Sequence, residues 1–256
     1  MGQTYAQIYR DMKDAGFLGV YMGHRPVLVL KDPELIKNFL VKDFDHFHDH
    51  GFVFDEKVDP LLANLFMLTG KKWKDLRADL SKTFTSGKIK RMFGKTVECS
   101  QELVEYLKIA ADVQDTIEAK DVMVKFTTDI IASCAFGIQC YCFKNPNSEF
   151  MKYGKRMQQL TYLDNLKGLL YLTFPKLAIY LGIPLTDTSV AKFFRGAVKE
   201  IVDFRMESKE RRNDFIELLL ELMEEQTFQG KIFNFIVLSF ISISSVYISI
   251  PKYRID

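Results

Sequence analysis

The sequence GKKWKDLR at residues 70–77 contains the only tryptophan of the chain, Trp73, and places Arg77 four residues later. On an α-helix this spacing puts both side chains on one face, with their Cβ atoms about 5–6 Å apart. An indole offers one N–H donor and no acceptor, and a guanidinium offers a planar fork of donors that can hold a carboxylate with two hydrogen bonds. Trp73 and Arg77, called the donor pair below, therefore suit a ligand that carries acid groups. The same spacing is also typical of an arginine stacked on a tryptophan at a helix surface.

Four further segments lie around the donor pair in a distinctive order. They are KDPELIK at residues 31–37, FDHFHD at 44–49, TFTSGK at 83–88 and TTDIIASCAFG at 127–137. Together with the donor pair they closely resemble the amino-terminal part of the cytochrome P-450 superfamily, the haem-thiolate monooxygenases, and in particular its insect microsomal detoxification branch. The resemblance covers most of residues 4–225. It implies a haem cofactor whose propionates accept hydrogen bonds from Trp73 and Arg77.

Apolar periodicity predicts a mainly α fold with a small amino-terminal β-sheet. Apolar runs at 17–22 and 26–30 flank a turn and predict a hairpin. Apolar residues at three- and four-residue intervals predict helices. These helices cover residues 4–15, 32–41, 88–111, 121–138 and 189–210, and others begin near Ser148 and Asn213. Residues 162–172 carry further apolar side chains. The resemblance implies a truncated cytochrome P-450 fold that lacks the carboxyl-terminal haem-thiolate half, with residues 1–230 forming the amino-terminal part of one domain.

Residues 42–69 keep no period for long, and apolar side chains there alternate with aspartates and prolines. From the residues alone, this stretch is interpreted as an ordered loop over a core. The resemblance implies instead that the loop helps to line a substrate pocket. The expected substrate contacts are Phe52, Phe54, Leu61, Leu65 and Phe66.

Histidines and cysteines provide no recognisable metal site. His46 and His48 are two residues apart, and no third ligand follows at a structural-zinc spacing, so both are interpreted as polar surface or turn residues. Haem-thiolate chemistry needs a cysteine thiolate on the iron. The family supplies it from a glycine-, phenylalanine- and arginine-rich loop, and no cysteine here has such surroundings; the four are Cys99, Cys134, Cys140 and Cys142. We therefore assign no catalytic residue and no metal ligand.

The charges of the chain argue against a nucleic-acid partner. Its 35 basic and 33 acidic residues are interspersed and leave a net charge of +2, so there is no basic field to collect a polyanion. The resemblance implies other partners: a small lipophilic substrate, an NADPH-dependent reductase and a membrane surface. It also implies a location on the cytosolic face of the endoplasmic reticulum membrane, although the family's usual amino-terminal anchor is not recognisable.

The tail over residues 231–256 differs in composition from the rest of the chain. Residues 232–250 contain no charged side chain, which satisfies the length criterion for a membrane span, but their many serines and β-branched residues are poor for insertion. We expect the resemblance to end after Gly230 and the tail to be foreign or membrane-associated sequence.

Three hypotheses follow from these patterns. The first is a haem-dependent monooxygenase that oxidises small lipophilic compounds such as xenobiotics, hormones or lipids, with this chain incomplete and inactive alone. The second is a non-catalytic, membrane-tethered helical protein that binds lipophiles or a partner. The third is a gene-model fragment without a stable fold. A reduced carbon monoxide difference spectrum separates them, and we expect no thiolate-type Soret band from this chain.

Overall fold

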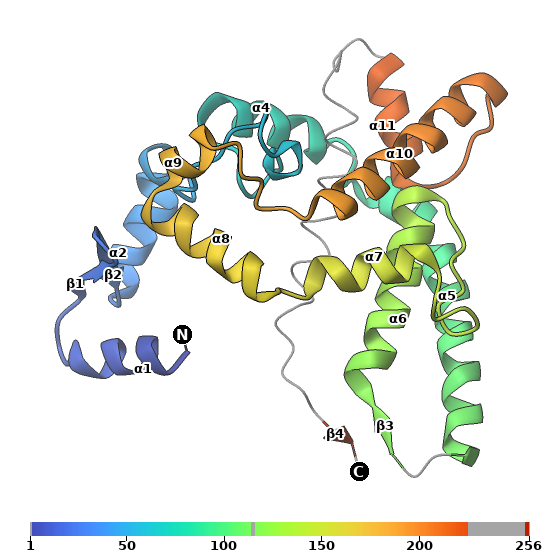
Figure 1. Cartoon of the computed structure of the whole chain (residues 1–256), viewed down its shortest axis with the longest axis horizontal. Helices are drawn as coiled ribbons and strands as arrows, with labels where there is room; N and C mark the ends of the chain where they lie inside the picture. The colour runs from blue at the N-terminus through green and yellow to red at the C-terminus, as the bar shows by residue number, and fades with distance from the viewer. Residues whose placement is uncertain (1, 114–115, 225–253, 256) are drawn as a thin grey trace.

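The computed structural model describes residues 2–113, 116–224 and 254–255 and is mainly helical (Figure 1). The predicted amino-terminal elements are present: helix α1 (Gly2–Asp11) and strands β1 (Phe17–Met22) and β2 (Arg25–Leu30). The strands pair antiparallel with Met22 opposite Arg25, so Gly23 and His24 form a two-residue turn. Gly23 has φ +64°, a value that glycine adopts without steric cost. The predicted hairpin is therefore confirmed.

The next helix begins as its sequence predicts. The Asp32 side chain accepts a hydrogen bond from the Leu35 N–H at 2.8 Å, and Pro33 is the first helical residue. Helix α2 (Pro33–Lys37) continues directly into the π-helix η1 (Asn38–Lys42). The predicted loop after it contains two short helices that the sequence did not indicate, α3 (Phe44–Phe47) and the 3₁₀ helix η2 (Pro60–Leu62).

The two helices that come after the helix with the donor pair, α5 (Ser86–Val113) and α6 (Ala119–Ile131), run alongside each other (Figure 1). Helix α4 (Gly70–Ser81) carries the donor pair, and α5 follows after a short turn. Helix α6 extends into the π-helix η3 (Ala132–Phe136), which ends at Gly137 with φ +67°. The short strand β3 (Ile117–Glu118) pairs antiparallel with β4 (Arg254–Ile255).

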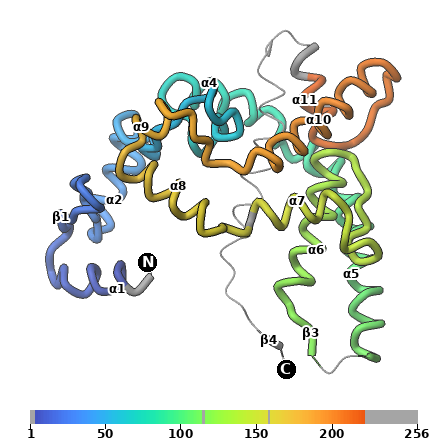
Figure 2. The backbone as a smooth tube through the Cα atoms, viewed as in Figure 1, coloured from blue at the N-terminus to red at the C-terminus, as the bar shows by residue number. Residues whose placement is uncertain are grey.

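The remaining helices carry the chain away from α6 and back again. They are α7 (Glu149–Gln158), α8 (Tyr162–Thr173), α9 (Pro175–Tyr180), α10 (Thr188–Ser208) and α11 (Phe215–Glu224). Figure 2 shows α7 and α8 leading toward the amino-terminal end of the molecule and α10 returning to α6 and α7. The Thr186 N–H donates to the Asp59 side chain at 2.7 Å, which ties the connection between α9 and α10 to the loop before α4.

The core lies where α6, α7, α10 and α11 meet. Phe136 and Phe194 are fully buried there, and Phe150 packs edge-on against both rings at 5.3 and 5.4 Å between centroids. Seven described residues of α6 and η3 are buried, so this apolar helix is central to the fold. Edge-to-face rings add about 0.5–1.5 kcal/mol per pair to the area that they bury.

One buried ion pair joins the ends of α10 and α11 to this core. The Arg205 guanidinium donates two hydrogen bonds to the Asp214 carboxylate, at 2.7 and 2.6 Å, and both side chains are almost fully buried. Arg205 also donates to the Phe136 carbonyl at 3.3 Å. Asp214 Oδ1 accepts from the Glu217 N–H at 3.0 Å, so the same carboxylate caps the first turn of α11.

The start of α8 provides a pH-dependent prediction. Hydrogen bonds from the Thr161 hydroxyl and N–H, with the Arg156 guanidinium nearby, lower the pKa of Asp164 to about 2. A carboxyl whose pKa is lowered by folding stabilises the protein above its unfolded pKa and loses that contribution as the pH falls through the folded value. We expect Asp164→Asn to be less stable than the parent chain at pH 7. In urea unfolding series, the difference should shrink as the pH falls from about 4 to about 2, and a difference independent of pH would contradict this account.

Apart from Arg254 and Ile255, the predicted tail over 231–256 lies outside the described residues, as does the candidate membrane span at 232–250. Each helix in the described part of the chain is too short or too polar to cross a membrane.

Candidate cofactor-binding site

Helix α4 places the donor pair on one helical face, as the sequence predicts. Its amino-terminal end is capped from the preceding loop, because the Gly70 N–H donates to Asp49 Oδ1 at 2.8 Å. Two ion pairs hold the helix to the same loop, Lys74 to Asp45 at 2.7 Å and Lys72 to Glu56 at 2.6 Å. The position of the donor pair therefore depends on residues 45–56.

The two members of the donor pair differ in their surroundings. The Trp73 side chain is half-buried, with its ring 6.0 Å from the Phe44 ring and 5.6 Å from the His48 ring, centroid to centroid. Arg77 is exposed, one helical turn further along α4. The aromatic contacts limit the orientations of the indole, whereas the guanidinium can move to meet a ligand.

The donors of both side chains are available for a ligand. Among the described residues, neither the Trp73 indole N–H nor the Arg77 guanidinium has a protein hydrogen-bond or ion-pair partner. An acid group that reached both would receive up to three N–H donors without displacing an internal contact. The donor set therefore fits a ligand with carboxylates such as the haem propionates.

The predicted substrate contacts occupy two different environments. Leu61 is fully buried in the core, and Leu65 packs against it. Phe52 and Phe66 are exposed, and their ring centroids are 5.6 Å apart. Phe54 is half-buried. Phe52 and Phe66 thus form an accessible apolar pair, whereas Leu61 packs in the core.

His48 lies against the donor pair, a contact that its spacing in the sequence did not indicate. Its side chain is only 14% exposed and lies against Trp73 and Phe44, so it is not a surface residue, although it follows α3 directly as a turn residue would. The spacing of Phe44 and His48, four residues apart, would have indicated a shared helical face. That signal was hidden because the surrounding stretch has no sustained period. His46, in contrast, is exposed on α3.

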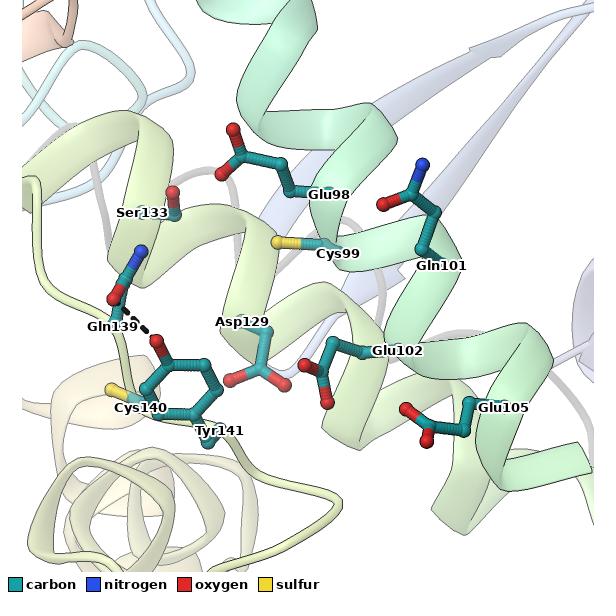
Figure 3. A pocket seen from close by; sticks show the side chains of 10 residues that line it. All are labelled: Glu98, Cys99, Gln101, Glu102, Glu105, Asp129, Ser133, Gln139, Cys140 and Tyr141. Atoms are coloured by element: carbon teal, nitrogen blue, oxygen red, sulfur yellow. Dashed lines mark hydrogen bonds between the residues drawn. The ribbon is translucent and has the colours of Figure 1, made fainter. Parts of the chain in front are cut away.

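A separate cavity of about 350 Å³ lies between α5, α6 and the segment after η3 (Figure 3). Its lining includes four carboxylates: Glu98, Glu102 and Glu105 from α5 and Asp129 from α6. Burial raises the pKa of Asp129, and the nearby charge of Glu102 adds to the rise. Both Asp129 oxygens accept from the Cys142 N–H at 3.0 Å, so this carboxylate already has a structural partner. The donor pair does not line this cavity.

Three of the cysteines near this cavity lie in surroundings that disfavour the thiolate form. Burial raises the pKa of the Cys99 thiol to about 11, with a further contribution from the charge of Asp129. Burial also raises the pKa of Cys134, and contact with Cys140 together with burial raises that of Cys142. Reactive or ligating cysteines normally have lowered pKa values. In the described part of the chain, no group of three or more histidine, cysteine or acidic side chains has the geometry to hold a metal ion.

Comparison with known proteins agrees with the resemblance. The family model for cytochrome P450 matches residues 3–238. Cytochrome P450 6A1 of Musca domestica is 38% identical over 223 residues, which are 87% of this chain and 44% of that protein. Cytochrome P450 6a2 of Drosophila melanogaster is 37% identical over 230 residues, which are 88% of this chain and 46% of that protein. Cytochrome P450 6j1 of Blattella germanica is 32% identical over 264 aligned residues. The alignment covers 100% of this chain and 52% of that protein.

Two consequences follow from these matches. The family match reaches residue 238 and so includes the first residues of the tail at 231–256. The chain spans about half the length of the curated relatives that it matches. With a family model matching nearly the whole sequence, the chain belongs to the cytochrome P450 family.

Proposed function

We propose that this chain forms the propionate-binding side of the haem site in a monooxygenase. The enzyme would oxidise small lipophilic compounds with O₂ and electrons from an NADPH-dependent reductase. The observation that carries the proposal is the donor pair: its side chains share one face of α4, and their donors have no protein partner among the described residues. Family membership supports haem as the ligand.

The protein side of this site has two tasks. Trp73 and Arg77 would fix the porphyrin through its two acid groups, and Arg77 could supply two parallel hydrogen bonds to one carboxylate. Haem, when bound, supplies the oxygen-activating iron. The loop before α4 would present apolar side chains to the substrate, with Phe52 and Phe66 as its accessible part. An apolar surface of this kind favours lipophilic molecules, because their burial releases water from both surfaces.

We also propose that the protein works at the cytosolic face of the endoplasmic reticulum membrane. Supporting this, α8 and α9 carry large apolar side chains that are strongly exposed. Tyr162 is 83% exposed, Leu163 65% and Tyr180 86%. Exposed apolar groups of this size commonly mark contacts with a membrane or another protein.

The test is a titration of the purified chain with haemin, followed by Soret absorption. We expect Arg77→Gln to raise the dissociation constant roughly 10- to 100-fold, because a hydrogen bond to a charged group contributes about 1.5–3 kcal/mol. Trp73→Phe removes the N–H donor and keeps an aromatic ring, so it should weaken binding in the same direction. In a reduced carbon monoxide difference spectrum we expect no thiolate-type band, because none of the four cysteines has the glycine-, phenylalanine- and arginine-rich surroundings from which the family supplies its iron ligand.

Lys71→Gln is the matched control. It removes one positive charge from the same helix, where Lys71 is exposed and paired with Asp75 at 2.9 Å. Exposed pairs of this kind contribute at most about 1 kcal/mol, and we expect haemin affinity to change less than about twofold. Equal losses in Lys71→Gln and Arg77→Gln would show a general charge effect and contradict the proposed site.

A further inference from the structure

His48 connects the loop before α4 to the donor pair. Its Nδ1 lies 2.9 Å from the Asp45 carbonyl oxygen. A carbonyl oxygen can only accept a hydrogen bond, so Nδ1 must carry a hydrogen. The other ring nitrogen, Nε2, is buried and has no aligned hydrogen-bond partner in the described part of the chain, although Asp49 Oδ1 lies 3.2 Å away.

This geometry makes the contact depend on protonation. In a neutral ring with its hydrogen on Nδ1, Nε2 presents a lone pair toward the Asp49 carboxylate, which is unfavourable. In the protonated ring, Nε2–H faces the same oxygen and forms an ion pair after a small rotation. Asp49 also accepts from the Gly70 N–H at 2.8 Å. Protonated His48 would thus be linked through Asp49 to the first residue of α4.

The other charged groups near His48 come from α3 and α4. The Asp45 carboxylate accepts from Lys74 Nζ at 2.7 Å, and that hydrogen bond lowers the pKa of Asp45, with smaller contributions from the charges of His48 and His46. The Asp45 carboxylate is therefore anionic at neutral pH. Lys74 balances Asp45, which leaves Asp49 as the carboxylate that faces the ring.

We propose that His48 is a positioning residue for Trp73, which in its protonated form holds the indole in the orientation that donates to an acid ligand. The ring centroids of His48 and Trp73 are 5.6 Å apart, with the ring planes inclined by 30°. The position of the imidazole therefore limits the space that is open to the indole. The inference rests on the proposed function of the donor pair and adds pH regulation to it: affinity for haem falls as His48 loses its proton.

The chain offers a direct probe, because Trp73 is its only tryptophan. A protonated imidazole in contact with an indole quenches its fluorescence. Without haemin, we expect the fluorescence of the full chain to rise through one transition as the pH is raised. His48→Gln and His48→Phe should both abolish the transition. His46→Gln is the matched control and should retain it, since His46 is exposed and two residues away.

Haemin titrations of the same variants, read from Soret absorption at pH 6 and pH 8, test the effect on binding. The parent chain should bind more tightly at pH 6. We expect His48→Gln to raise the dissociation constant at pH 6 about three- to tenfold, the usual size of one aromatic contact. His48→Phe keeps the ring contact, so it should bind about as tightly as the parent chain at pH 6 but lose the dependence on pH.

The fluorescence series and the haemin titrations test the role of His48 and the proposed function separately. If haemin fails to bind any variant, the proposed function fails, while the fluorescence transition in the haemin-free chain still tests the contact of His48 with Trp73. A transition that survives in both His48 variants, or disappears in His46→Gln, would overturn the role of His48. Circular dichroism of each variant checks that the helices remain formed.

Discussion

Asp214→Asn is expected to lower the free energy of unfolding by about 3–5 kcal/mol, the usual result of removing one partner from a buried ion pair. The substitution leaves the Arg205 guanidinium 3% exposed and without its bidentate carboxylate. It also weakens the cap on α11, because Asp214 accepts from the Glu217 N–H. Glu217 Oε2 lies 4.0 Å from Arg205 Nη1 and can compensate only in part.

Urea unfolding followed by circular dichroism measures this effect. Asp203→Asn on α10 is the matched control, because Asp203 is exposed and paired with Lys199 at 2.6 Å on the same helix; its cost should be about 0.3–0.5 kcal/mol. Replacing both partners by apolar residues, as in Arg205→Met with Asp214→Leu, should recover much of the loss. Equal stability of Asp214→Asn and Asp203→Asn would mean that the buried pair is not formed in solution.

Gly137→Ala is expected to destabilise the protein by about 2–4 kcal/mol. About 1 kcal/mol comes from the positive φ of +67°. The rest comes from crowding, because a Cβ at this position would lie 2.6 Å from Arg205 Nη2 and still closer to Asp214 Oδ2. The alanine must therefore displace the buried ion pair or the end of η3, and either movement weakens the hydrogen bonds between them.

Gly182→Ala separates the two contributions. Gly182 has φ +65°, and no atom of the described residues lies within 4 Å of a Cβ placed there. It should cost only the conformational part, about 1 kcal/mol. If the two alanine variants lose the same stability in urea, the close approach of the ion pair to Gly137 is not real.

The features that could be predicted from the sequence are those whose hydrogen bonds close within a few residues. Asp32 caps Leu35 and Ser148 caps Met151, each three residues apart. The donor pair shares a helical face because four residues make about one turn. The hairpin follows from apolar runs around a glycine that can adopt a positive φ.

The arrangement around the donor pair could not be predicted in the same way. Asp49 caps α4 from 21 residues away, and Lys74 reaches back 29 residues to Asp45. The ring contact of His48 with Trp73 depends on both connections. Leu61 illustrates the same limit, because its side chain alone does not show whether it faces a substrate or the core, and the structure places it in the core.

By itself, the sequence of this protein determined its family, most of its longer helices, the caps that lie within three residues of a helix start, and the shared helical face of Trp73 and Arg77, because each of these depends on local spacing or on the order of segments. Only the tertiary structure decided which charges are buried, that His48 lies against Trp73, and that Gly137 has no room for a side chain. Those properties arise where segments far apart in the chain pack together, and their partners are set by the whole fold rather than by neighbouring residues.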